Sequence, residues 1–221
     1  MSTTEVRNPV FARLYARLAP AMEREVAAHR SELLAGLRGR VVELGAGTGL
    51  NFSHYPPRVA EVVAVEPEPY LRAKAIDAAG AAPVSVTVVD AVADALPFGD
   101  ASFDAAVCSL VLCSVPDQAT ALAQLHRVLR PGADLRFFEH VRDRSPRKAR
   151  VQEAFDRARI WPLLAGGCHC ARDTRAALAA AGFVVERARE VPIGSRWSLT
   201  TAHLLGSARR VGRAWPRPDG R

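Results

Sequence analysis

The sequence lacks the features of secreted and membrane-spanning proteins. It contains only 4 cysteines in 221 residues, which is too few for a disulfide framework in a chain of this length. No run of about 18 apolar residues occurs, and no secretory signal precedes the first predicted helix. We therefore expect reduced thiols and a cytoplasmic location. Arginine is strongly preferred to lysine, which is typical of GC-rich bacterial genomes.

Acidic residues are concentrated in the middle of the chain. The formal net charge is +7, but residues 41–140 hold 6 basic and 12 acidic residues, whereas residues 141–221 hold 17 and 7. An acidic centre argues against nucleic acid as a partner. The basic flanks are either an ordinary solvated surface or a surface for peripheral contact with anionic membrane lipids.

Apolar periodicity predicts an α/β architecture. Phe11, Leu14, Tyr15 and Leu18 follow helical spacing, so residues 8–37 are expected to be helical with an interruption at Pro20. The arginines of this segment are expected on its other faces (Arg13, Arg17, Arg24 and Arg30). After one strand that ends before Gly45, the expected strands are 59–65, 84–89, 103–108, 133–140, 183–191 and 200–205, and the expected helices are 51–55, 70–79, 117–129, 151–164 and 173–181.

This alternation predicts a mostly parallel, seven-stranded sheet with helices on both faces. The final strand is the candidate for an antiparallel neighbour. Residues 142–150 are expected to form a charged connector. We expect a single domain over residues 1–221, divided into an N-terminal helical cap (1–38), a sheet core (40–206) and a basic tail (207–221).

A glycine-rich segment follows the first predicted strand. Within Arg40–Asn51, glycine recurs at positions 45, 47 and 49, and Leu50 stands where the dinucleotide fingerprint requires its last glycine. Glycine allows positive φ and lacks the Cβ that would keep a ligand away from the backbone. Because ligands of such sheets bind at the carboxyl ends of strands, the segment is either a ligand-binding loop or an ordinary tight turn.

Glu66 ends the second predicted strand, 23 positions after Glu43. A carboxylate at this place can accept hydrogen bonds from both hydroxyls of a ribose. Its distance from the glycine-rich segment favours that interpretation over an incidental surface carboxylate.

Five motifs in order resemble one enzyme family. They are Val41–Gly49, Glu66, Ala93–Phe98, Ser102–Val107 and Leu125–Gly132. Together they resemble class I S-adenosylmethionine (SAM) methyltransferases of the ubiquinone/menaquinone-biosynthesis type, over about residues 10–190. The resemblance implies a Rossmann-like fold and SAM as the cofactor. The cofactor-binding residues that it implies are Tyr15, Glu43, Gly45, Ala46, Gly47, Gly49, Asn51, Glu66, Pro67, Val92, Ala93, Asp94, Cys108 and Ser109.

Two of these positions leave alternatives open. Tyr15 either reaches the SAM carboxylate, as the corresponding tyrosine commonly does in the family, or is a core aromatic residue. Val92 stands where relatives often carry an Asp that binds the adenine amino group. Adenine is therefore expected to bind backbone N–H groups near Val92 and Ala93, or the carboxylate of Asp94 or Asp90.

Three further segments are similar to the mammalian methyltransferase-like proteins that act as microsomal alkyl-thiol S-methyltransferases. They are Cys108–Val115, Phe138–Val141 and Gly167–His169. This resemblance implies a small-molecule thiol as the methyl acceptor. Those relatives carry a hydrophobic N-terminal membrane anchor, which the present sequence does not lead us to expect.

The expected chemistry is displacement at a sulfonium methyl group, for which the protein positions, desolvates and deprotonates the acceptor. His140 ends the fifth predicted strand and is either the general base or a structural histidine. Trp161, Cys168 and His169 are expected to line the acceptor pocket. One Cys-x-Cys pair with a His between falls short of a zinc ligand set, so no metal is expected.

The acceptor class stays open at this level. After a thiol, the alternatives are a phospholipid amine and the hydroxyl of a quinone or secondary metabolite. A SAM-binding protein without catalytic activity is the alternative from another class. The sequence does not indicate an oligomeric state.

Overall fold

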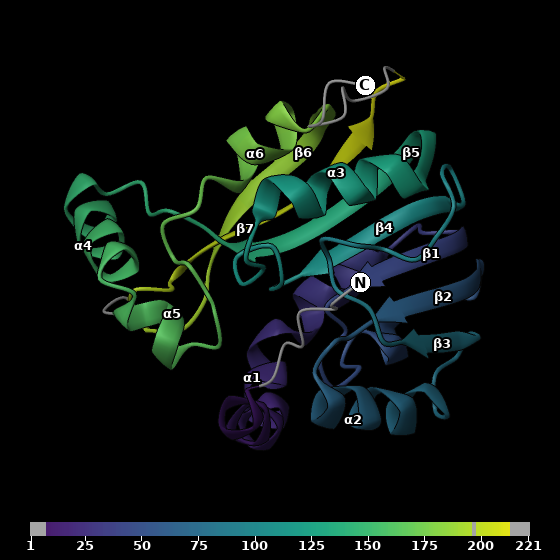
Figure 1. The fold of residues 1–221 in the computed structure, drawn as a ribbon, viewed down its shortest axis with the longest axis horizontal. Coiled ribbons are helices and arrows are strands. Elements are labelled where there is room, and N and C mark those ends of the chain that lie inside the picture. The colour runs from purple at the N-terminus through teal and green to yellow at the C-terminus, as the bar shows by residue number, and fades with distance from the viewer. Residues whose placement is uncertain (1–7, 196–197, 213–221) are drawn as a thin grey trace.

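The computed structural model describes residues 8–195 and 198–212. Its centre is a seven-stranded sheet in the order β3-β2-β1-β4-β5-β7-β6 (Figure 1). β7 runs antiparallel to β5 and β6, and the other neighbouring strands pair in parallel. The strands are β1 (Gly39–Leu44), β2 (Val59–Val65), β3 (Val86–Val89), β4 (Phe103–Ser109), β5 (Leu129–His140), β6 (Phe183–Pro192) and β7 (Ala202–Arg210).

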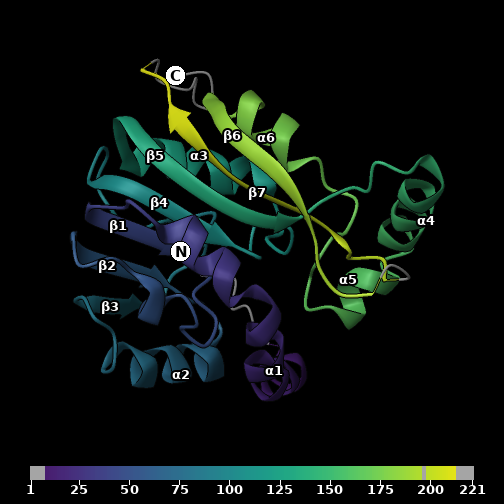
Figure 2. The same cartoon turned by 180° about the vertical axis from the view of Figure 1, so that it is seen from behind.

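Helices cover both faces of the sheet (Figures 1 and 2). The helices on these faces are α1 (Pro9–Leu34), α2 (Pro69–Ala79), α3 (Gln118–Val128) and α6 (Thr174–Ala180). Two further helices, α4 (Pro146–Arg157) and α5 (Ile160–Leu164), pack on each other beyond the end of the sheet, and a 3-10 turn spans Phe52–His54. Neighbouring residues of β1 point to opposite faces. Val42 joins a core with Leu125 of α3, whereas Val41 joins a second core with Leu34 of α1. The predicted two-faced, mostly parallel sheet is confirmed.

α1 is one continuous helix and contains Pro20 in its interior, so the predicted interruption is wrong. Proline removes one helical hydrogen bond and frees the carbonyl of the preceding turn. Pro20 lies on an exposed side of α1, where water can satisfy that carbonyl. Ala19, Val26 and Leu34 are buried. Figures 1 and 2 show that α1 changes direction between its first turns and the rest of the helix, as expected of a helix with a proline in its interior, although the helix does not end there.

Two predicted boundaries differ from the structure around the fifth strand. β5 begins at Leu129, because Arg130–Gly132 form an irregularity within the strand rather than a break before it. Its pairing with β4 shifts between Phe103 and Ala105, which accommodates Pro131. The region after β5 was predicted as a connector followed by one helix, and it instead forms α4 and α5. Arg159, with a φ of 56°, separates these two helices.

The last strand also extends beyond its predicted end. β7 runs through Arg210, into the segment assigned to a basic tail, because Ser207 and Ala208 are buried on the sheet and pair with both neighbours. Residues 213–221 of that tail lie outside the described residues. Among the described helices, none combines the length and the apolar character needed to cross a membrane.

Candidate functional site at the carboxyl edge of the sheet

The glycine-rich loop leaves β1 at the carboxyl edge of the sheet, and its conformation requires glycine. Gly45, Gly47 and Gly49 have φ values of 64°, 59° and 82°, which side chains rarely adopt. A Cβ on Gly45 would lie 2.3 Å from Cγ2 of Val111. The loop is therefore packed directly against the segment that follows β4. Ala46, between two of these glycines, is buried.

Glu43 is buried at the end of β1 and fixes the chain that follows the loop. Its carboxylate accepts hydrogen bonds from Asn51 Nδ2 at 2.8 Å and from the Tyr55 hydroxyl at 2.7 Å. Burial raises the pKa of Glu43 to about 6, although both donors act to lower it. Through these two bonds, Glu43 orients Asn51 and Tyr55 beside the loop.

Glu66 folds back from β2 onto the glycine-rich loop. One carboxylate oxygen accepts from the Gly47 N–H at 2.7 Å, and the other accepts from the Glu68 N–H at 3.0 Å. Burial raises the pKa of Glu66 to about 7. The next residue, Pro67, is held by its carbonyl, which accepts from Arg72 Nη1 at 2.8 Å. The loop and the acid predicted to share one ligand therefore meet.

α1 covers the loop from the other side and brings Tyr15 and Arg30 to it. A Cβ on Gly47 would lie 3.5 Å from the Tyr15 ring and hydroxyl. Burial raises the pKa of Tyr15, and the nearby Arg30 charge acts to lower it. Arg30 is 5% exposed, and its Nη1 donates to Asn51 Oδ1 at 2.7 Å and to the Ser109 hydroxyl at 3.0 Å.

The structure thus corrects the placement of Arg30, which the sequence analysis assigned to an outer face of the helix. Arg30 falls four residues after Val26 and four before Leu34, both buried. That helical spacing was the signal in the sequence. It was overlooked because arginine is almost never fully buried without a partner, and here Glu23 supplies one at 2.9 Å from Nε.

The segment after β3 carries the residues predicted for adenine. Val92 and Ala93 are partly buried, and Ala93 packs against the core on the α3 face. Asp94 Oδ1 is buried and has no hydrogen-bond partner within the described residues. Burial raises the pKa of Asp94, with a further contribution from Asp117. A buried carboxylate oxygen without a hydrogen-bond donor in the protein is suited to a donor that a bound ligand supplies. Asp90, the alternative, is mostly exposed and pairs with Arg72.

Cys108 and Ser109 end β4 and occupy different surroundings. Cys108 is fully buried in the core on the α3 face, where burial raises its thiol pKa well above the usual value. It therefore supports the sheet. Ser109 is partly buried and binds Arg30, so it belongs to the network around the loop.

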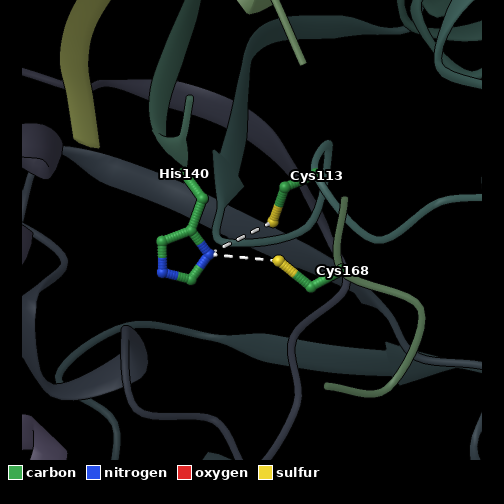
Figure 3. Close-up of side chains that lie close together, drawn as sticks. All are labelled: Cys113, His140 and Cys168. Carbon is green, nitrogen blue, oxygen red and sulfur yellow. Dashed lines mark hydrogen bonds between the residues drawn. The ribbon is translucent and has the colours of Figure 1, made fainter. Parts of the chain in front are cut away.

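A cluster of three side chains lies further along the same edge (Figure 3). The imidazole Nδ1 of His140, at the end of β5, is 3.4 Å from Cys168 Sγ and 3.7 Å from Cys113 Sγ. The interaction with Cys168, together with burial, raises the pKa of Cys113 to about 12. Burial alone would lower the pKa of His140, but Cys113 and Glu139 raise it. Cys113 was absent from the predicted site residues.

Backbone contacts hold these three segments together. The buried Glu139 carboxylate accepts from the N–H groups of Val111, Leu112 and Cys113 at 3.1, 2.9 and 3.2 Å. The His169 N–H donates to the Cys113 carbonyl at 2.7 Å. The Arg172 guanidinium donates to the Leu112 and Val115 carbonyls. β5, the segment after β4 and the loop that carries Cys168 therefore form one unit.

The other predicted acceptor residues lie outside this cluster. The His169 side chain approaches Asp156, with Nδ1 3.9 Å from Oδ2. Cys170 also turns to Asp156, with Sγ 3.5 Å from Oδ1. Trp161 lies in α5, and its indole N–H is buried without a hydrogen-bond partner among the described residues. The loop is tied to α1, because a Cβ on Gly166 would lie 2.2 Å from the Phe11 ring.

A glycine-rich loop after β1 and an acid at the end of β2 define a nucleotide-type binding site at the carboxyl edge of an α/β sheet. Residues 42–137 match a family model described as a methyltransferase domain. The chain is 33% identical over 210 residues to the human thiol S-methyltransferase TMT1B, a match that covers 90% of this chain and 85% of that protein. The chain belongs to the SAM-dependent methyltransferases, as its motifs predicted.

Solved structures confirm the Rossmann-like methyltransferase fold. The cyclase SpnF aligns with a TM-score of 0.65 at 20% identity, covering 91% of this chain and 95% of that one. A 1,6-didemethyltoxoflavin-N1-methyltransferase of Burkholderia thailandensis, solved with S-adenosylhomocysteine, aligns with a TM-score of 0.63 at 22% identity, covering 92% and 85%.

The residues at this edge fit SAM as the cofactor. Buried oxygens without partners in the described part of the chain, Asp94 Oδ1 and Thr48 Oγ1, suit donors brought by a ligand. The carboxylate of Glu66 is suited to ribose hydroxyls, and Arg30 supplies a buried positive charge beside the loop.

Proposed function

We propose that this protein transfers the methyl group of SAM to the sulfur of a small-molecule thiol. The observation that carries the acceptor class is the similarity to the human thiol S-methyltransferase over 90% of this chain. Support also comes from the cluster of the buried Cys113 and Cys168 with the partly buried His140, which lies at the edge of the sheet that holds the glycine-rich loop. An amine acceptor has weaker support, because the similarity to a phosphatidylethanolamine N-methyltransferase of Cereibacter sphaeroides is 30% identity over 65% of this chain.

SAM supplies an electrophilic methyl group, so the protein has mainly to bind and orient. In our proposal Glu66 accepts the ribose hydroxyls, and Asp94 with the backbone at Val92 and Ala93 receives the adenine. Tyr15 and Arg30 lie over the loop and are assigned to the carboxylate end of the cofactor. Glu43 and Asn51 keep the loop in shape.

The acceptor thiol has to lose its proton before its sulfur attacks. A thiol with a pKa near 8.5 is only a few per cent ionised at neutral pH. His140 lies at the sheet edge beside two cysteine sulfurs, and we assign it to this step. Replacing His140 with Ala is expected to lower kcat by roughly 10²-fold. An unchanged kcat would show that His140 is not the general base and has a structural role.

The test is the release of S-adenosylhomocysteine with matched panels of thiols, amines and phenols. The proposal expects turnover with thiols. Calorimetric titration with SAM and S-adenosylhomocysteine establishes cofactor binding separately. Turnover with phospholipid amines or phenols alone would contradict the thiol assignment, and binding without any turnover would favour the non-catalytic alternative.

We further propose that one face of the molecule contacts anionic membranes. Val10, Leu14, Leu18 and Met22 recur every four residues along α1 and are 45–77% exposed. Ile160, Leu163 and Leu164 of α5 are also exposed. The two helices are neighbours in both views, and Phe11 packs on Gly166 just after α5 (Figures 1 and 2). Exposed Arg13 and Arg17 flank the apolar stripe and complement anionic headgroups.

A further inference from the structure

Cys113, His140 and Cys168 have the composition and the spacing of a metal site (Figure 3). Tetrahedral zinc holds sulfur at about 2.3 Å and nitrogen at about 2.0 Å, which places neighbouring ligand atoms about 3.4–3.8 Å apart. The two N–S distances here are 3.4 and 3.7 Å, and the three ligand atoms lie within 4.8 Å of one another. We propose that these side chains bind Zn²⁺, and that its fourth position receives the acceptor thiol.

The ligand set favours zinc over the hard divalent cations. Two thiolates and one imidazole are soft donors that suit zinc and exclude magnesium and calcium, which prefer oxygen ligands. Cys113 is 1% exposed and Cys168 is 5% exposed, so the site is largely withdrawn from water. The Cys-x-Cys pair noted in the sequence is not the site, because Cys170 faces Asp156 instead.

The three ligands are oriented before any metal binds. Glu139 holds the Cys113 backbone against the strand that carries His140, through bonds to three consecutive N–H groups. The His169 N–H holds the Cys168 loop to the Cys113 carbonyl. Such outer contacts fix ligand geometry and strengthen metal binding. Little rearrangement is therefore needed for the three atoms to share one ion.

The position of the cluster couples it to methyl transfer. Val111 packs on Gly45 of the cofactor loop, and it precedes Cys113 by two residues. Its N–H also binds the carboxylate of Glu139, next to His140. An acceptor held at the cluster is thus placed on the carboxyl edge that presents the cofactor loop. This functional part of the proposal rests on the proposed thiol methyltransferase activity, whereas the metal site itself does not.

The metal-bound sulfur of the acceptor is the nucleophile in the proposed methyl transfer. The acceptor thiol binds zinc through sulfur, and its proton leaves to solvent. A lone pair of the bound thiolate forms the new bond to the methyl carbon, and the bond from that carbon to the sulfonium sulfur breaks. The electron pair remains on the sulfur of S-adenosylhomocysteine. The neutral thioether is a weaker ligand and leaves the metal. With zinc bound, His140 acts as a zinc ligand, and this role replaces the general-base role that we assign to it in a metal-free site.

Metal content tests the site without any acceptor. Purified protein, kept in a non-thiol reductant, is stripped with a chelator and titrated with Zn²⁺ alone. We expect one zinc per chain, and a thiolate-to-metal charge-transfer band when Co²⁺ is used instead. Cys113→Ser, Cys168→Ser and His140→Ala should each weaken zinc binding by about 100-fold or more. The matched control is Cys170→Ser, which removes a thiol from the same loop and should retain stoichiometric binding.

Circular dichroism of each variant establishes that it is folded, and the cobalt spectrum of the unaltered protein provides a measurement that needs no variant. Absence of stoichiometric zinc binding and of the cobalt band would overturn the site, whatever the activity. Equal binding by Cys170→Ser and weaker binding by the three cluster variants supports it.

Thiol methylation with and without zinc tests whether the metal activates the acceptor. If zinc activates the acceptor, stripping should lower kcat/KM for thiols about 10-fold or more at pH 7, because a free thiol is mostly protonated there. Added Zn²⁺ should restore the rate. Equal thiol turnover with and without zinc would overturn the activating role and leave the proposed function intact. Zinc binding without turnover of any thiol would overturn the proposed function and leave the metal site.

Discussion

Glu66 is partly protonated near neutral pH before the cofactor binds. Burial raises its pKa to about 7, and the ionised carboxylate accepts hydrogen bonds from two ribose hydroxyls more strongly than the neutral acid does. Below pH 7, cofactor binding must first remove this proton, so affinity for S-adenosylhomocysteine should rise as pH increases through about 7 and then level off. Calorimetry across pH 5.5–8.5 should show proton release near pH 6–7 and a flatter profile for Glu66→Gln. A flat profile for the unaltered protein would contradict this role.

The raised pKa of Glu66 also affects the stability of the ligand-free protein, which it lowers as pH increases. The folded pKa is raised above the value of about 4.5 expected for the unfolded chain. The unfolded chain therefore loses this proton first, and the contribution of Glu66 to stability falls as pH rises from about 4.5 to 7. Cofactor binding and stability thus depend on pH in opposite directions through this one residue.

Arg30 is a buried cation with three side-chain partners, and its removal leaves them unpaired. Arg30→Ala should lower the free energy of unfolding by about 3 kcal/mol, because Glu23, Asn51 and Ser109 each lose a hydrogen bond. Urea denaturation measures this. Arg24→Ala, on an exposed position of the same helix, should change stability by less than about 0.5 kcal/mol. Equal effects would show that the Arg30 network contributes little.

At the scale of elements, the loop after β1 depends on its glycines. Gly45→Ala places a Cβ at positive φ and 2.3 Å from Val111. We expect a loss of about 2 kcal/mol in stability and at least 10-fold weaker S-adenosylhomocysteine binding. Gly99→Ala is the matched control, since nothing lies within 4 Å of its Cβ position. Thermal melting and calorimetry compare the two, and unchanged binding by Gly45→Ala would contradict the requirement for glycine.

The elements that the sequence predicted well are those with strong local signals. The strands before Gly45 and Glu66 were predicted from their runs of β-branched residues, and both residues lie at the carboxyl edge of the sheet, as predicted. The continuity of α1 through Pro20 and the start of β5 at Leu129 were missed, because packing of distant residues overrides local breakers. The meeting of Cys113 with Cys168 also escaped prediction, because residues 55 positions apart are joined only by tertiary contacts.

At the scale of the whole molecule, the exposed faces of α1 and α5 should decide whether the protein binds membranes. The full chain should co-sediment with vesicles containing phosphatidylserine, and binding should weaken as salt rises. Leu14→Glu and Leu163→Glu should reduce binding, because each places a negative charge where an apolar side chain meets the bilayer. Phosphatidylcholine vesicles are the control for charge. Absence of salt-sensitive binding would end this proposal.

α1 touches both ends of the site at once. Its Tyr15 lies against Gly47 of the cofactor loop, and its Phe11 lies against Gly166 of the loop that carries Cys168. We therefore expect both products of methyl transfer to leave past this one helix. Their release should share one rate-determining opening of that helix, so that a burst of product in the first turnover precedes slower steady cycling. Phe11→Ala, which loosens one of the two contacts, should speed the steady phase more than the burst.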